Sequence, residues 1–78
     1  MSKNETEIFN YVNDLVSRRL GWKATLTVYR NEIWSAAEAH FQWGKVGAQL
    51  TKAMLHEVAR LNNAVYITDN GRARIVKN

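Results

Sequence analysis

The sequence predicts an α+β domain with the element order α-β-β-α-β-β, in which a four-stranded antiparallel sheet carries two helices on one face. Three observations lead to this prediction. Apolar residues recur at helical spacing near the N-terminus and again from about Val46 to Leu61. The stretch between these segments alternates like a hairpin, and the last fifteen residues hold two β-rich runs around an Asn-Gly turn. The chain has no repeat and no linker, so residues 1–78 are predicted to form a single domain.

Composition narrows the classes of function. Eleven Lys and Arg residues against seven Asp and Glu give a net charge of +4, and a positive field favours encounter with nucleic acid or an acidic protein. Without cysteine, and with two histidines, the chain cannot build a closed zinc site, and we expect no metal and no cofactor. No apolar run has signal-peptide or membrane length, so we expect a cytoplasmic protein without membrane contact. A homodimer would enlarge the core of so small a domain, so self-association is a further expectation.

The first helix is expected to begin at Asn4, where Glu7 three residues later completes a capping-box pattern. Gly21 follows the last apolar position and is expected to end the helix, with Arg18 and Arg19 in its last turn. The apolar stripe of this helix consists of Ile8, Phe9, Val12, Leu15, Val16 and Leu20.

The stretch "TLTVYRNEIWSAAEAHF" (residues 25–41) fits two structures. As a hairpin turning at Asn31-Glu32, it brings Tyr29 beside Trp34 and sorts its remaining residues onto a core side and a polar side. That core side holds Trp22, Ala24, Leu26, Val28, Ala37, Ala39 and Phe41. As a helix from Ser35, it uses good helix formers and gives the element order of a winged helix, with residues 46–61 as recognition helix and Asp69–Arg74 as wing. A strand from Lys23 to Arg30 is long for a winged helix, so we favour the hairpin and keep the winged helix as the alternative.

The second helix, about Val46 to Leu61, presents three faces. Its expected core stripe is Val46, Leu50, Ala53, Met54, Val58 and Leu61. A polar face consists of Gln49, Lys52, His56 and Arg60. A narrow strip of Ala48, Leu55 and Ala59 would let another helix approach closely, and is the expected contact of a dimer.

The C-terminal hairpin allows two registers. A two-residue Asn70-Gly71 turn places Ile67 opposite Arg74. A three-residue loop ending in a left-handed Gly71 pairs Tyr66 with Arg74 and separates apolar from polar residues, so we favour it.

No catalytic constellation stands out, so the chain is predicted not to be an enzyme, and surfaces become the candidate sites. On the open face of the predicted sheet, aromatic and arginine side chains gather, as they do in protein interfaces and on surfaces that stack single-stranded nucleic acid. The expected partner-binding residues are Tyr29, Trp34, Tyr66, Arg72, Arg74 and Lys23. The alternative nucleic-acid-binding residues are Gln49, Lys52, His56 and Arg60.

The order "TLTVYRNEIWSAAEAHF…GAQLTKAMLHEVARLNNAVYIT" resembles small phage and mobile-element proteins of the anti-CRISPR kind that inhibit type I systems. The resemblance implies a non-enzymatic protein that binds a host defence ribonucleoprotein complex in the bacterial cytoplasm and blocks its DNA binding or its nuclease recruitment. The alternative function is that of a winged-helix transcriptional regulator that binds DNA.

Overall fold

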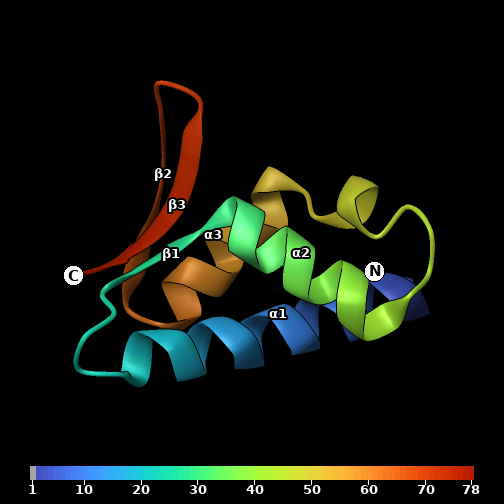
Figure 1. Ribbon diagram of the computed structural model, residues 1–78, viewed down its shortest axis with the longest axis horizontal. Coiled ribbons are helices and arrows are strands. Elements are labelled where there is room, and N and C mark those ends of the chain that lie inside the picture. The colour runs from blue at the N-terminus through green and yellow to red at the C-terminus, as the bar shows by residue number, and fades with distance from the viewer. Residues whose placement is uncertain (1) are drawn as a thin grey trace.

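Three α-helices and a three-stranded antiparallel sheet make up the structure, a computed structural model that describes residues 2–78 (Figure 1). The elements are α1 (Lys3–Gly21), β1 (Thr27–Tyr29), α2 (Arg30–Phe41), the short 3-10 helix η1 (Gly47–Gln49), α3 (Lys52–Leu61), β2 (Ala64–Asp69) and β3 (Arg72–Lys77). The α+β class is confirmed, whereas the predicted four-stranded sheet is wrong. The observed element order is the one expected for the winged-helix alternative.

Helix α1 has its N-cap at Ser2, two residues earlier than predicted. The Glu5 backbone N–H donates to Ser2 Oγ at 3.2 Å, and the Ser2 N–H donates to Glu5 Oε1 at 3.3 Å, which completes a capping box. The hydrogen bonds from Ser2 hold the pKa of the Glu5 carboxyl below its usual value. The predicted cap at Asn4 is therefore wrong, but the apolar stripe of α1 is buried as expected, with Phe9 only partly buried: Ile8, Val12, Leu15, Val16 and Leu20.

Residues 30–41 form α2, so the predicted hairpin across Asn31-Glu32 is wrong. Helix propensity prevails here because Ile33 and Ala37, four residues apart, both face the core and are fully buried. The partner of β1 comes instead from β3, with Val28 opposite Ile75. Trp22 and Leu26, which the hairpin would have buried, are 70% and 58% exposed.

Helix α3 is shorter than the predicted helix and begins only at Lys52. Thr51 caps it, because the Met54 backbone N–H donates to Thr51 Oγ1 at 3.1 Å. Its buried residues are Met54, Leu55, Val58 and Ala59, whereas Ala53 and Leu61, predicted to be core residues, are exposed. The strip predicted to form a dimer contact therefore lies largely inside the domain.

The sheet has the strand order β1-β3-β2, and its hairpin turns through Asn70 and Gly71 alone. Both turn residues have positive φ (45° and 76°), as a tight primed turn requires, so the predicted three-residue loop is wrong. Tyr66 consequently pairs with Ile75 and is buried, while Ile67 pairs with Arg74. An arginine opposite Ile67 is tolerated because its guanidinium reaches Asp69 at 2.7 Å.

One hydrophobic core holds these elements together. Its fully buried side chains include Ile8 from α1, Val28 from β1, Ile33 from α2, Leu55 from α3 and Ile75 from β3. The β2–β3 hairpin projects beyond the helices, as Figure 1 shows. Within residues 2–78, no helix combines the length and the apolar character needed to cross a membrane.

Gly47 is predicted to be essential for the contact between η1 and α2. A Cβ added at Gly47 would lie 2.6 Å from Trp34 Cε2, so Gly47→Ala must displace the indole, whose Nε1 donates to Glu38 Oε1 at 2.9 Å. We expect a loss of about 1–3 kcal/mol in the free energy of unfolding, as for other overpacked contacts, and a red shift of tryptophan fluorescence.

The matched control is Gly44→Ala, because a Cβ at Gly44 meets no atom within 4 Å. The stabilities of the two variants are compared by thermal and denaturant unfolding. Equal stability of the two variants would contradict the close Gly47–Trp34 contact.

Candidate nucleic-acid interface

The outward face of α3 carries three of the four polar residues predicted for the alternative site. Lys52, His56 and Arg60 recur at four-residue spacing and are exposed, on the side of α3 opposite its buried residues. Gln49 lies outside α3, in η1, and is partly buried. Because the core holds the other side of α3, this face stands in a fixed orientation.

The three side chains on this face differ in their surroundings. The His56 ring meets the Tyr66 ring edge-on, with centroids 4.9 Å apart, which ties the middle of α3 to β2. Arg60 is held by Glu57, and that pairing lowers the pKa of the Glu57 carboxyl and raises the pKa of Arg60. Lys52 forms no ion pair within residues 2–78.

A hollow of about 320 Å³ lies between the starts of α2 and α3 and the hairpin. Arg30, the first residue of α2, and Lys52, the first residue of α3, both line it. The rest of its lining is Leu50, Tyr66, Thr68, Gly71 and Ala73. Two cations at the starts of two helices therefore face one concave surface.

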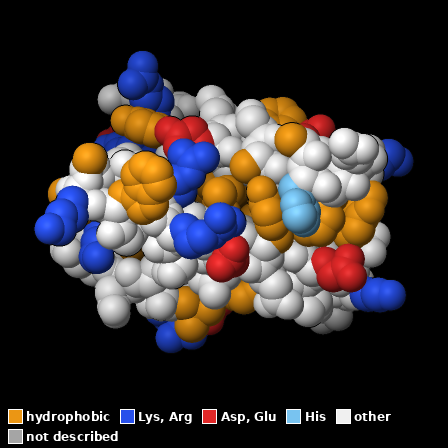
Figure 2. Space-filling view, turned by 60° about the horizontal axis from the view of Figure 1, so that its bottom comes forward, with side chains coloured by type: hydrophobic (Ala, Val, Ile, Leu, Met, Phe, Trp, Pro, Cys, Tyr) orange, Lys and Arg blue, Asp and Glu red, His pale blue; other side chains and the backbone are white. Residues whose placement is uncertain are grey.

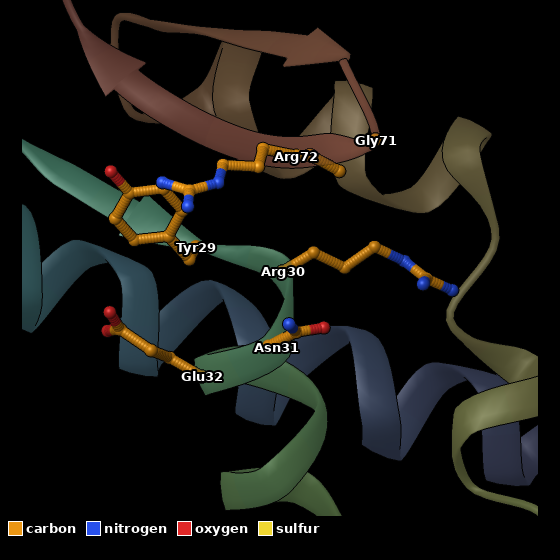
Figure 3. A pocket seen from close by; sticks show the side chains of 7 residues that line it. Tyr29, Arg30, Asn31, Glu32, Gly71 and Arg72 are labelled. Carbon is orange, nitrogen blue, oxygen red and sulfur yellow. The ribbon is translucent and has the colours of Figure 1, made fainter. Parts of the chain in front are cut away.

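A second hollow, of about 420 Å³, lies beside the first between α2 and the turn of the hairpin (Figure 3). Arg30 and Arg72 line it together with Tyr29, and in Figure 3 the two arginine side chains point in opposite directions. Neither arginine forms an ion pair in the described part of the chain. Together with Lys52 they form what we call the basic triad, Arg30, Lys52 and Arg72, contributed by three elements.

The side of the molecule that carries α1 has a mixed composition of surface side chains. Figure 2 shows basic, acidic and hydrophobic side chains mixed over this side without a continuous basic field. Arg18 pairs with Asp14 at 3.0 Å and Arg19 with Glu32 at 3.5 Å, so these cations are partly neutralised. The cations of the basic triad, in contrast, have no carboxylate partner in the described chain.

The predicted partner-binding surface is only partly assembled. Tyr29, Arg72 and Arg74 share the outer face of the sheet, since Tyr29 pairs with Arg74 and the residues next to them in register face the core. Tyr66 is on the inner face and only 6% exposed, so its predicted place on the open face is wrong. Trp34 is on α2 against Gly47, and Lys23 is in the loop that joins α1 to β1.

Sequence reasoning missed Arg30, because the predicted hairpin placed it at the end of a long strand. The feature that marks Arg30 as a candidate site residue is its position at the start of α2. The N-cap of this helix, Tyr29, provides no side-chain hydrogen bond. The free backbone N–H groups of such a helix start favour anions. Within residues 2–78, no group of three or more His, Asp or Glu side chains is placed to hold a metal ion.

No protein-family model, curated protein or solved structure matches this chain. The function is therefore inferred from the geometry of α3, the hairpin and the basic triad.

The Asp69–Arg74 hydrogen bonds lead to a prediction about the hairpin. The Arg74 guanidinium donates to Asp69 at 2.7 and 3.3 Å and holds the pKa of that carboxyl below its usual value. Arg74→Gln is expected to raise the pKa of Asp69, as measured by an NMR titration of its carboxyl carbon. Because the folded-state pKa is lowered, the pair stabilises the fold above the unfolded-state pKa and loses this effect as the pH falls through the folded value.

Arg72→Gln is the matched control, since Arg72 lies directly opposite Asp69 in register and yet donates no hydrogen bond to it. If the pKa of Asp69 rose as much in the Arg72 variant as in the Arg74 variant, Arg74 would not be the residue that specifically lowers this pKa.

Proposed function

We propose that this chain is a winged-helix protein that binds duplex DNA, with α3 as recognition helix and the β2–β3 hairpin as wing. The observation that carries the proposal is the exposed face of α3 with Lys52, His56 and Arg60, next to which Arg30 and Lys52 line one hollow and Arg30 and Arg72 line the adjoining one. The order of helices and strands also supports it, because two consecutive helices precede a projecting hairpin.

The dimensions of α3 suit the major groove. An α-helix with its side chains is about 10–12 Å wide, and the major groove of B-DNA is about 12 Å wide. Ala53 is small and exposed beside His56 and Arg60, so the helix can approach base edges closely. The opposite side of α3 is fixed by Leu55 and Val58, and docking therefore needs no rearrangement of the core.

The basic triad supplies phosphate contacts around this helix. Arg30 and Lys52 each stand at a helix start, where the backbone N–H groups add to the attraction for a phosphate. Arg72 follows the Asn70-Gly71 turn and extends the basic surface to the wing. Such contacts position a protein on DNA, while His56 and Arg60 on α3 reach the bases.

This proposal is tested by the salt dependence of duplex binding, measured as fluorescence anisotropy of a labelled duplex. We expect binding at low salt, with log K falling linearly against log salt concentration by about 0.9 for each phosphate contacted. Arg30→Gln, Lys52→Gln and Arg72→Gln should each reduce that slope by about one.

Lys23→Gln is the matched control, because Lys23 is an exposed, unpaired cation in the described chain and lies in the loop after α1. Its slope should equal that of the wild type. Failure to bind any duplex at low salt, or an equal loss in the Lys23 variant, would overturn the proposal.

A second candidate function rests on the outer face of the sheet. There Tyr29, Arg72 and Arg74 lie together, and Val65, which is exposed on the same face, adds an apolar contact. Such a surface suits an inhibitor of the anti-CRISPR kind, which would bind a host defence complex and block its DNA binding or nuclease recruitment. Under this candidate, Tyr29→Ala abolishes binding to the purified complex and Lys52→Gln leaves it intact. If α3 instead binds DNA, Lys52→Gln weakens binding to a duplex and Tyr29→Ala leaves that binding intact.

A further inference from the structure

The Arg60–Glu57 pair lies on the outward face of α3, where duplex DNA would dock. Arg60 Nε donates to Glu57 Oε2 at 3.0 Å, and Arg60 Nη2 donates to Glu57 Oε1. Both side chains are well exposed, 68% for Arg60 and 44% for Glu57, so the pair adds little to stability. Its consequence is geometric, because two hydrogen bonds fix the plane and direction of the guanidinium.

A guanidinium has two edges that can donate a pair of parallel hydrogen bonds. Glu57 occupies the edge formed by Nε and Nη2. The edge formed by Nη1 and the second hydrogen of Nη2 remains open toward solvent, and no protein acceptor within residues 2–78 engages it. Two parallel donors on an arginine match the O6 and N7 acceptors of guanine in the major groove.

Charge favours a base over a phosphate as the target of this edge. The Glu57 carboxylate offsets the charge of Arg60, which weakens the attraction for a phosphate, whereas hydrogen bonds to guanine keep their directional match. The basic triad already provides cations without a carboxylate partner. Arg60 is therefore suited to a guanine, whereas the three residues of the basic triad are suited to phosphates.

The position of Arg60 brings it to the same surface as Ala53 and His56. Seven residues separate Ala53 from Arg60, which is about 10.5 Å along a helix and close to the rise of three base pairs. All three residues are exposed on the side opposite the core, and Ala53 is too small to hold the helix away from the bases.

We propose that Arg60 reads a guanine in the major groove and that Glu57 is a positioning residue, which holds the guanidinium in the orientation for this contact. The inference rests on the proposed DNA-binding function and deepens it, since it assigns a base preference to one side chain.

The test selects binding sites from a randomised duplex pool and then measures affinity for duplexes that differ only at the selected position. The wild type is expected to prefer guanine there by roughly tenfold or more over each other base. Arg60→Lys keeps the charge but loses the paired donors, and Glu57→Gln loses the fixed orientation, so both should reduce the preference to below about threefold. Glu57→Gln should also steepen the salt slope, because it removes a negative charge near the DNA.

Asp14→Asn and Arg18→Lys are the matched controls, because they alter an exposed ion pair that belongs to α1 and not to the outward face of α3. Both should keep the wild-type base preference. A wild type that selects no guanine, or a Glu57→Gln variant that binds more tightly with its guanine preference intact, would overturn the inference while duplex binding stands. A wild type that binds no duplex would instead overturn the proposed function itself.

Discussion

Strand β3 lies between β1 and β2, and the rest of the structure depends on the core that its buried Ile75 forms with Val28 and Tyr66. This pairing joins the N-terminal half of the chain to the C-terminal hairpin. It places the start of α2, which follows β1 directly, beside the hairpin turn, where Arg30 and Arg72 line one hollow. The same core fixes α3 through Leu55 and Val58, so the buried side of each element determines which cations meet on the outside.

Ion pairing then divides the basic residues into two groups. Arg18, Arg19, Arg60 and Arg74 each have a carboxylate partner, which orients the side chain and offsets its charge. The basic triad has no such partner in the described residues, and neither have Lys3, Lys23, Lys45 and Lys77. Of the unpaired cations, Arg30, Lys52 and Arg72 line two adjoining hollows beside the hairpin turn, and this grouping is what the proposed DNA binding rests on.

Local sequence patterns predicted some elements and misassigned others, for identifiable reasons. The apolar stripe of α1 and the position of the hairpin are strong local signals, and both are observed. The segment around Trp34 alternates well enough for a strand, but its helix is decided by Ile33 and Ala37 meeting the core, and β1 finds its partner at the far end of the chain. Lys52, His56 and Arg60 were predictable as one face because they belong to a single helix, whereas Arg30 and Arg72 come together only through the sheet.

Backbone amide shifts of isotope-labelled protein, followed by NMR during titration with a duplex, test most directly whether α3, the wing and the start of α2 form one DNA-binding surface. The account predicts that the largest shifts fall on Lys52, His56 and Arg60, on the Asn70–Arg72 turn and on Arg30, and that α1 stays unchanged. Shifts confined to the outer sheet face around Val65 and Tyr29, or no shifts at low salt, would contradict it.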